Sequence, residues 1–458
     1  MNIIVVGDGK VGFAIAKQLN QEGHDITVVE NKANVLSSTM NQLDIVGVQG
    51  NGASLDILLE ARVPLEARVP SSDLLIAATS TDEVNIICCL LAKKLGARHT
   101  IARIRNPEYN NTVRLIKDEL GLSMSINPEQ AAAREILRAI RFSNSIKVSS
   151  FAKGRIELAE VKVTENSPLI NMRVVDINRR FKTEVLFVTI LRDGEVIIPN
   201  GNTMIYANDR LTLTGSTTQL ERFFIKIGIL SDRTVNEVMI VGGGRITYYL
   251  TSMLLELGMA VKIIELNKEK CINLVEKFPQ ATVIHGDGTD HELLLSESLE
   301  EMDAFIALTD NDEENVIISM FAQSHGVTHV LPKVNRVSLG FLLEKLGLEN
   351  SITPKFITAN QIVQYVRAMQ NTVGSNVESL IKLVDDKVEV LEFRVRDNCR
   401  FIDVPIKDLN IRKGIIIAYV THKGVSKVAT GDTRIQLSDT VIIISKVAGL
   451  RDINDLLS

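Results

Sequence analysis

Near the start of the chain stands Ile3-Ile4-Val5-Val6-Gly7-Asp8-Gly9-Lys10-Val11-Gly12, and a near copy, Val238-Met239-Ile240-Val241-Gly242-Gly243-Gly244-Arg245-Ile246, opens its second half. Each stretch is an apolar run followed by a glycine-rich turn, which is the pattern of a strand that passes into a helix around a phosphate. A later apolar run in each half ends in Glu30 or Glu265, and these two residues keep the separation of Gly7 and Gly242. Two such units in register predict a duplicated nucleotide-responsive module rather than one cofactor domain that serves one catalytic domain.

The composition is that of a globular protein. The 458 residues are 45% hydrophobic and 23% charged, enough for roughly three or four domains with sizeable cores. A net charge of −5 and the absence of tryptophan give no general basis for binding nucleic acid. No apolar run approaches the about 18 residues of a membrane span. We expect the N-terminus to enter a strand directly, without a signal peptide. We therefore expect a cytoplasmic protein with no membrane insertion of its own.

Short apolar strands alternate with amphipathic helices in both halves, which predicts an α/β fold with doubly wound, Rossmann-type parallel sheets. Each sheet module is followed by a segment of alternating polar and apolar residues, 151–228 and 388–446, that predicts a small α+β domain. The expected domains are 1–145 and 231–372 for the two Rossmann modules, and 146–230 and 373–458 for the two small ones. Helical stretches 129–142 and 358–370 are expected to link the two kinds of domain within each half. A tandem duplication, 59–64 repeated as 65–70, lengthens one connection, and its origin stays open.

The first glycine turn has the full G-x-G-x-x-G pattern. Gly7 permits the tight turn, Gly9 lets the backbone approach a pyrophosphate, and Gly12 lets the helix pack closely on the strand. The anion then lies on the free N–H groups at the start of the helix. Glu30, at the end of the second strand, would accept hydrogen bonds from ribose hydroxyls and repel a 2′-phosphate, which favours NAD over NADP.

The second turn departs from this pattern because Thr247 replaces the third glycine, although Gly242, Gly244 and Glu265 are kept. A β-branched side chain at this place must push the helix and strand apart or find its own niche. Arg245 follows the turn and either reaches a phosphate or is a solvated surface residue. We expect a second nucleotide site with altered affinity or preference.

The ends of the fourth and fifth strands lie at the sheet edge where doubly wound folds bind ligands. Thr79-Ser80-Thr81-Asp82-Glu83 and Thr309-Asp310-Asn311-Asp312-Glu313 follow the fourth strand of each half. Their hydroxyl groups could bond a ribose or a ring, or Thr or Asp could cap the helix that follows. Arg103, matched by Lys333, could contact phosphate.

Other patterns in the sequence resemble catalytic or metal-binding motifs but are better explained by structural roles. His285-Gly286-Asp287-Gly288-Thr289-Asp290-His291 resembles a metal cluster, but the equivalent Gln49-Gly50-Asn51-Gly52 lacks such ligands, so a strand-end turn is favoured. Tyr419 and Lys423 have the Tyr-x-x-x-Lys spacing of short-chain dehydrogenases, but on a strand that runs into a turn rather than on a helix. The cysteines Cys88, Cys89, Cys271 and Cys399 show no C-x-x-C pairing and are expected as buried, reduced thiols. No catalytic or metal-binding residues are therefore expected.

Assembled in this order, the glycine turn, Glu30, the Gly50-Asn51-Gly52 turn, the stretch Thr79–Asn85 and Ile101-Ala102-Arg103-Ile104-Arg105 closely resemble the TrkA family. These are the peripheral NAD-binding components of Trk-type potassium uptake systems, with a regulator-of-K⁺-conductance (RCK) N-terminal and C-terminal domain in each half. The resemblance covers essentially the whole chain. It implies a non-catalytic subunit, assembled as a homotetrameric ring on the cytoplasmic face of the cell membrane, that gates a TrkH-type potassium channel in response to NAD(H), with ATP and ADP as further candidate ligands.

The family's roles carry over residue by residue. Those of the first site fall on Gly7, Asp8, Gly9, Lys10, Val11, Gly12, Glu30, Thr79, Ser80 and Arg103. Those of the second site fall on Gly242, Gly243, Gly244, Arg245, Ile246, Glu265, Thr309, Asp310 and Lys333. Two other functions stay open beside this one: an NAD-dependent oxidoreductase whose β-rich modules bind substrate, and a small-ligand sensor that acts through those modules.

Overall fold

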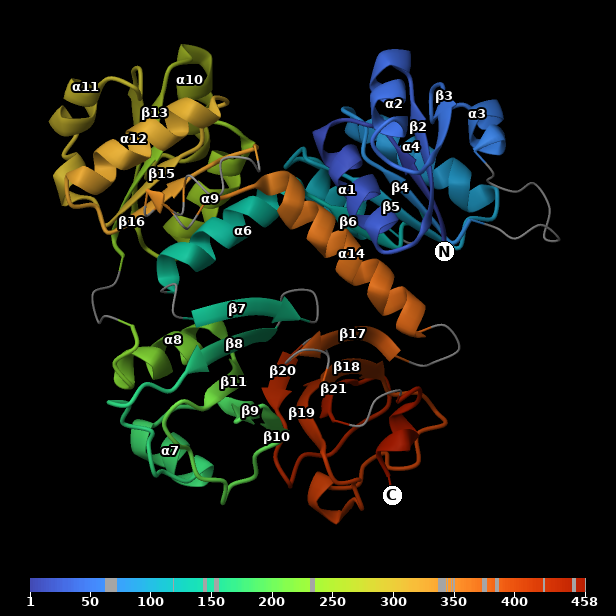
Figure 1. Cartoon of the computed structure of the whole chain (residues 1–458), viewed down its shortest axis with the longest axis vertical. Helices are drawn as coiled ribbons and strands as arrows, with labels where there is room; N and C mark the ends of the chain where they lie inside the picture. Colours follow the sequence, from blue (N-terminus) through green and yellow to red (C-terminus); the bar gives the residue numbers. More distant parts are fainter. Residues whose placement is uncertain are drawn as a thin grey trace. The chain divides into compact units, whose positions relative to one another are not determined.

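The computed structural model describes residues 1–61, 72–117, 119–142, 146–151, 156–230, 235–336, 343, 345–346, 348, 351–372, 377–383, 387–422, 425–446 and 450–457. The chain divides into two compact units, Met1–Ile140 with Val235–Val363, and Arg141–Thr234 with Gln364–Ser458. Figure 1 shows that the first unit holds helices around parallel sheets and the second holds mostly antiparallel strands. Most of the tandem duplication lies outside the described residues.

The first sheet of the first unit is the expected doubly wound sheet. Its strands are β1 (Asn2–Val6), β2 (Asp25–Glu30), β3 (Val46–Gln49), β4 (Leu74–Ala77), β5 (His99–Arg103) and β6 (Met124–Ile126), in the parallel order β3-β2-β1-β4-β5-β6. Its helices are α1 (Lys10–Gln21), α2 (Ala33–Met40), α3 (Leu55–Glu60), α4 (Asp82–Lys94), α5 (Tyr109–Leu115) and α6 (Pro128–Arg141). The central strands are continuous apolar runs because helices cover both faces of the sheet.

The second sheet repeats this arrangement. Its strands are β12 (Glu237–Val241), β13 (Ala260–Glu265), β14 (Thr282–His285), β15 (Ala304–Ala307) and β16 (His329–Pro332), in the order β14-β13-β12-β15-β16. Its helices are α9 (Arg245–Glu256), α10 (Lys268–Lys277), α11 (His291–Ser296), the short η1 (Leu299–Glu301), α12 (Asp312–Ser324) and α14 (Pro354–Thr372). The strand order reverses beside β1 and β12, and each glycine turn follows one of these two strands, which is where such sheets bind ligands.

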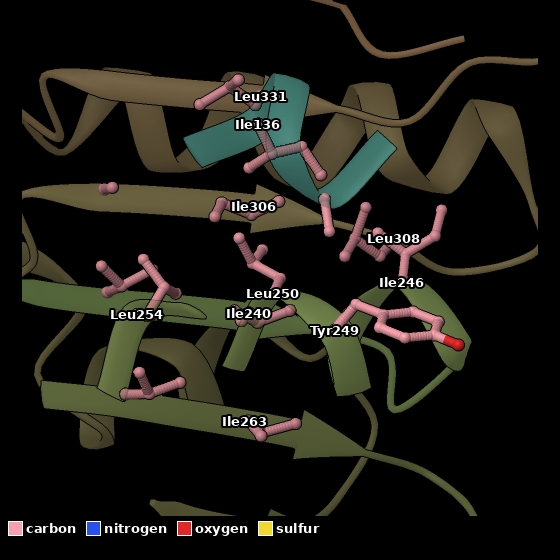
Figure 2. Packing of buried hydrophobic residues seen from close by; sticks show 14 of the residues in the cluster. Ile136, Ile240, Ile246, Tyr249, Leu250, Leu254, Ile263, Ile306, Leu308 and Leu331 are labelled. Carbon is pink, nitrogen blue, oxygen red and sulfur yellow. The ribbon is translucent and has the colours of Figure 1, made fainter. Parts of the chain in front are cut away.

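Helix α6 does not stay with its own half. Its buried residues Ala132, Ala133, Ile136 and Ile140 belong to the core of the second sheet, where they pack with residues such as Ile240, Ile306, Leu250 and Leu331. Figure 2 shows Ile136 of α6 lying among these side chains. The sequence predicts the helix itself but not its destination, because an apolar stripe does not say which sheet it covers.

Helix α14, from the second half, has a matching contact with the first half. The side-chain amide of Gln18 on α1 donates to Asn360 Oδ1 on α14 at 2.8 Å, and Ala359 and Ile362 of α14 are fully buried. Figure 1 shows the start of α14 beside α1. The two Rossmann modules of the first unit therefore exchange helices.

The second unit contains the two antiparallel sheets expected for the small domains. The first, with order β10-β9-β11-β8-β7, uses β7 (Ile146–Phe151), β8 (Ile156–Lys162), β9 (Leu186–Arg192), β10 (Glu195–Ile197) and β11 (Arg210–Gly215), with helices α7 (Val174–Phe181) and α8 (Thr217–Lys226). The second, with order β17-β18-β21-β19-β20, uses β17 (Val377–Leu383), β18 (Val388–Arg394), β19 (Ile415–His422), β20 (Val425–Val428) and β21 (Thr440–Ser445), with short helices η3 (Ile406–Asp408) and η4 (Ile453–Leu456).

Each sheet has a core of its own, and a further apolar cluster joins the two sheets, in which Leu158 and Val188 pack with Val390, Tyr419 and Ile442. A tight turn follows Arg192, with Asp193 and Gly194 both at positive φ between β9 and β10.

All four cysteines are buried and free of disulfides, as expected. Burial raises the pKa of the Cys88 thiol to about 12, so a reactive thiolate is not formed there. In the described part of the chain, no helix is both long and apolar enough to cross a membrane.

Candidate functional site

The first glycine turn has the geometry of an anion cradle. Gly7 has a φ of +92°, and a Cβ there would lie 2.8 Å from the backbone of Thr79. A Cβ on Gly12 would lie 1.9 Å from the Gly7 carbonyl oxygen, so only glycine allows α1 to start so close to β1. Gly9 precedes α1 without a side-chain cap. The first N–H groups of α1 are therefore left for a ligand.

Glu30 is held at the end of β2 by the turn itself. Its Oε2 accepts a hydrogen bond from the Asp8 backbone N–H at 2.8 Å, and its Oε1 accepts one from the Lys32 backbone N–H at 3.0 Å. Each carboxylate oxygen can accept a further bond. The carboxylate is thus fixed beside the glycine turn with acceptor capacity left for ribose hydroxyls.

Asp8, the second residue of this turn, is buried with only 4% of its surface exposed. Neither of its carboxylate oxygens has a hydrogen-bond donor in bonding geometry among the described residues. Burial, with a smaller contribution from the charge of Glu30, raises the pKa of the Asp8 carboxyl to about 6, although the nearby Thr39 hydroxyl opposes the shift. The sequence placed Asp8 in the cradle but gave no sign of this burial.

The second turn has the same backbone conformation as the first. Gly242 has a φ of +101°, and Gly244 precedes α9 as Gly9 precedes α1, again without a side-chain cap. Glu265 accepts hydrogen bonds from the backbone N–H groups of Gly243 and Asn267. The carboxylate is therefore held as Glu30 is, but with Gly243 in place of Asp8.

Thr247 is accommodated in the second turn by a hydrogen bond of its own. Its side chain is fully buried, and its hydroxyl donates a hydrogen bond to the Gly242 carbonyl oxygen. This is the oxygen that corresponds to the one a Cβ on Gly12 would meet in the first turn. A polar contact thus replaces the close glycine approach, so the start of α9 is fixed by a side chain rather than by backbone packing.

The ends of β4 and β5 are joined by an asparagine that the sequence analysis missed. Asn85 is fully buried; its Oδ1 accepts from the Thr79 backbone N–H at 2.8 Å and from the Thr79 hydroxyl at 2.7 Å, and its Nδ2 donates to the Arg103 carbonyl at 2.8 Å. Asn315 makes the equivalent contacts with Thr309 and Lys333.

Asp82 holds the next loop by accepting from the backbone N–H groups of Arg105 and Asn106, both at 2.8 Å. Asp312 does the same for Asn335 and Arg336. The signal that could have identified these residues is the D-E-x-N pattern shared by 82–85 and 312–315.

The expected capping by Thr or Asp is not what the structure shows. Helices α4 and α12 begin at Asp82 and Asp312, so both aspartates lie inside the first turn. Asn311 caps α12 by accepting from Glu313 and Glu314, whereas Thr81 makes no side-chain cap on α4. The hydroxyl groups of Thr79 and Thr309 instead donate hydrogen bonds to Asn85 and Asn315.

The cations at the strand ends differ between the halves. The Arg103 guanidinium donates to the Thr79 carbonyl at 3.2 Å, and burial, together with the charges of Arg105 and Arg245, lowers its pKa to about 10. Arg245 of the second turn is therefore near Arg103 of the first site. Lys333 instead forms an ion pair with Asp310 at 3.4 Å, whereas Ser80, at the position of Asp310, is uncharged and exposed.

A polar network joins the second turn to the first half. The Tyr249 hydroxyl on α9 donates to the Arg105 carbonyl at 2.9 Å and accepts from Asn127 Nδ2 at 2.8 Å. Arg105 in turn donates through its guanidinium to the Ser80 carbonyl at 3.2 Å. In the first half the position of Tyr249 is taken by Ala14, which has no hydroxyl group and cannot make the equivalent contact with the second half.

The patterns set aside in the sequence have structural roles. His285 ends β14 and contacts the Leu266 carbonyl, Asp290 caps α11, and His291 stacks on Phe321. Tyr419 lies on strand β19, as expected, while Lys423 lies outside the described residues. The described residues contain no group of three or more His, Cys, Asp or Glu side chains that could hold a metal ion.

Comparison with known structures supports the fold. The chain superimposes on the structure of the GsuK channel bound to NAD with a TM-score of 0.62 and 16% identity, over 97% of this chain and 76% of that one. For the crystal structure of the GsuK RCK domain the TM-score is 0.60 with 17% identity, over 97% and 92%. At this identity the likeness shows the fold, which is the expected one of Rossmann-type sheets with small α+β domains.

Comparison of sequences shows the family. The TrkA-N domain model matches residues 3–128 and 238–354, and the TrkA-C domain model matches residues 158–228 and 390–458. The chain is 30% identical to the Trk system potassium uptake protein TrkA homolog 2 of Methanosarcina mazei, over 100% of both proteins. It is 31% identical to the Trk system potassium uptake protein TrkA of Halomonas elongata, over 97% of this chain and 95% of that one. The chain belongs to the TrkA family of potassium uptake proteins.

Proposed function

We propose that this protein is a regulatory subunit that binds NAD(H) and gates a TrkH-type potassium channel. The observation that carries the proposal is the pair of uncapped glycine turns, each with a glutamate held in place by the turn's own N–H groups. The name of the family members and the NAD-bound GsuK structure support the same function.

In the first site, the N–H groups of Gly9, Lys10 and Val11 would hold the pyrophosphate, while Gly7 and Gly12 shape the turn. Glu30 would bind the ribose hydroxyls of one nucleoside. Thr79, Ser80 and Arg103 line the edge beyond β4 and β5, where the rest of a dinucleotide would lie. The Asp8 side chain is buried, so it is not among the groups exposed to the nucleotide.

The second site would use the corresponding residues Gly242, Gly243, Gly244, Arg245, Ile246, Glu265 and Thr309. It differs at Lys333, which forms an ion pair with the exposed carboxylate of Asp310, so a phosphate would compete with that carboxylate for the same ammonium group. We propose that this site binds dinucleotides more weakly or prefers a mononucleotide such as ATP or ADP. Arg245 and Arg103 would then share the terminal phosphates.

Gating follows from differential affinity. A nucleotide that binds one arrangement of the Rossmann modules better than another shifts their equilibrium by the difference in binding free energy. The exchanged helices α6 and α14 would transmit this shift, because each passes from one module onto the other and continues toward a small domain. In this proposal the domains 1–145, 146–230, 231–372 and 373–458 act as two coupled pairs.

We also propose that the protein acts as a homotetrameric ring on the cytoplasmic face of the cell membrane, attached through its channel partner. Support comes from exposed apolar side chains repeated in both halves: Ile87 on α4 is 46% exposed, and Ile317 at the same place on α12 is 57% exposed. An apolar position left in solvent twice at the same register suits a repeated protein contact.

The test is potassium flux in liposomes that contain a TrkH-type channel subunit and the full chain. Addition of NADH is expected to change the flux, and Glu30→Gln in the full chain should shift the NADH concentration that is needed. Liposomes with the channel subunit alone are the control. Turnover of a candidate substrate by hydride transfer, abolished by Glu30→Ala, would instead establish an oxidoreductase and overturn the proposal.

A further inference from the structure

The two glycine turns differ at one buried position that neither pyrophosphate nor ribose binding requires. The first turn has Asp8 where the second has Gly243. The backbone N–H of both residues donates to the glutamate of the same half, so the two positions are equivalent in space. One nucleotide site therefore contains a carboxyl group that the other lacks.

The surroundings of Asp8 leave its charge uncompensated. Glu30 on β2 is the charged group that acts on it, and it carries the same sign; α2 contributes only the hydroxyl of Thr39. Lys10 and Lys32, on the adjoining turn and helix start, are both exposed to solvent. A buried carboxylate beside a second carboxylate favours its neutral form.

A nucleotide would add further negative charge to this place. The pyrophosphate is expected on the N–H groups that follow Gly9, immediately after Asp8 in the chain, and the ribose on Glu30, which is bonded to the Asp8 N–H. We propose that the first site binds its nucleotide together with a proton on the Asp8 carboxyl, and that the second site, with Gly243, binds its nucleotide without one. This inference rests on the proposed nucleotide function.

The direction of the effect follows from linkage. The Asp8 carboxyl already has a pKa of about 6 without a ligand, and a nearby phosphate anion raises the pKa further. Binding then takes up a proton wherever the pH lies between the free and the bound pKa, so affinity at the first site rises as the pH falls. The increase is at most about tenfold per pH unit, because a single group is involved.

Titration calorimetry of the full chain with NADH tests the proposal. The Glu265→Gln variant serves as the background, because it weakens the second site and leaves the first to dominate the signal. Binding is measured near pH 7 in PIPES and in Tris, whose ionisation enthalpies differ, so the difference in heat gives the number of protons taken up. The same measurement on Asp8→Asn and Asp8→Gly in this background shows whether Asp8 is the carrier; asparagine keeps the shape of Asp8, and glycine copies Gly243.

We expect a net proton uptake, up to one per NADH, with Asp8 present, and affinity that rises as the pH falls from about 8 toward 6. Both Asp8 variants should show no uptake and an affinity that is nearly independent of pH. Uptake that persists in both variants, or NADH binding without uptake when Asp8 is present, overturns the inference while leaving the proposed function standing. Failure of the unsubstituted chain to bind NADH overturns both. Thermal melting of each variant confirms that it is folded.

Discussion

Glu30 is bonded to two backbone N–H groups, and this fixes its carboxylate at the place where a ribose would lie. Glu30→Gln is expected to weaken NADH binding at the first site by about 1–3 kcal/mol, because a neutral amide replaces a charge-assisted acceptor. It should also narrow the preference for NADH over NADPH, since the repulsion of a 2′-phosphate is removed. Calorimetry with both nucleotides is the measurement, and an unchanged NADH affinity would rule out Glu30 as the ribose ligand.

Asp8 also gives a stability prediction. Its pKa is raised from about 3.8 when the chain is unfolded to about 6 when it is folded, so the folded state holds the proton more tightly. The contribution of Asp8 to the free energy of unfolding is therefore greatest below about pH 4. It falls as the pH rises to about 6 and does not change above that pH. The shift corresponds to about 3 kcal/mol.

Asp8→Asn removes this group, so the variant should be more stable than the unsubstituted chain above pH 6, and the difference should shrink on acidification. Chemical denaturation at pH 5 and pH 8 measures it. If the difference in stability between Asp8→Asn and the parent is the same at both pH values, the pKa of the Asp8 carboxyl is not raised by folding.

At the level of single residues, the sequence predicts the cradle well because its chemistry repeats locally. Gly7 and Gly12 are needed because backbone segments approach closely there, and Glu30 is needed because it ends a strand. Both requirements can be recognised from the spacing of the residues in the sequence. Asp8 and Asn85 could not be placed in the same way. Their burial depends on α2 and on the end of β5, which lie far along the chain.

Among the elements, the start of helix α9 distinguishes the second site from the first. Thr247→Gly removes the hydroxyl bond to the Gly242 carbonyl and should cost about 1–2 kcal/mol of stability, because a glycine is also poorer within a helix. It should bring NADH binding at the second site closer to that of the first. Both chains carry Glu30→Gln so that the first site contributes less to the signal, and calorimetry with NADH gives the comparison.

Gly12→Ala is the matched change in the first half, and it should act in the opposite sense, since its Cβ would meet backbone rather than a flexible side chain. We expect loss of NADH binding at the first site. If alanine is tolerated there without loss of affinity, the close approach of α1 to β1 is not needed for the cradle.

Tyr249 is the other distinctive residue of α9, because its hydroxyl contacts the first half. Tyr249→Phe deletes only this oxygen and should cost about 1–2 kcal/mol, since the Arg105 carbonyl and the Asn127 amide lose a buried partner. Denaturant unfolding gives the change in free energy. Gln18→Ala, which removes an exposed inter-half bond, is the control and should change stability by less than about 0.5 kcal/mol.

The sequence predicts which segments are strands and which are helices, but it does not predict which sheet each helix packs against. Parallel strands that are buried on both faces are apolar runs in the sequence, so the alternation of strands and helices in both halves could be predicted. The stripe of α6 reads as an amphipathic helix in either location, so the sequence could not reveal that it covers the second sheet. That contact depends on the tertiary arrangement of the two halves.

For the whole molecule, the repeated apolar positions predict where copies of the chain meet. Ile317→Asp places a charge on a side chain that is 57% exposed, so the variant should fold normally. If α12 lies in the ring contact, each interface should weaken by about 2 kcal/mol or more, and the ring should dissociate at lower protein concentration. Light scattering after size exclusion measures the mass.

Val425→Asp, at another exposed apolar side chain in the second unit, is the control and should leave the assembly intact. An Ile317→Asp protein with the mass of the unsubstituted chain would show that α12 does not take part in assembly.

The exchange of α6 and α14 has a consequence for how unequal sites are combined. Separate copies of a single half could cover their apolar helices only by finding one another, so their pairing would depend on dilution, and like halves could pair with like. A single polypeptide makes the encounter intramolecular, at a high local concentration. Every molecule then contains one turn with a buried carboxyl group and one turn held by a threonine hydroxyl. Their one-to-one stoichiometry is fixed, and neither expression level nor dilution can alter it.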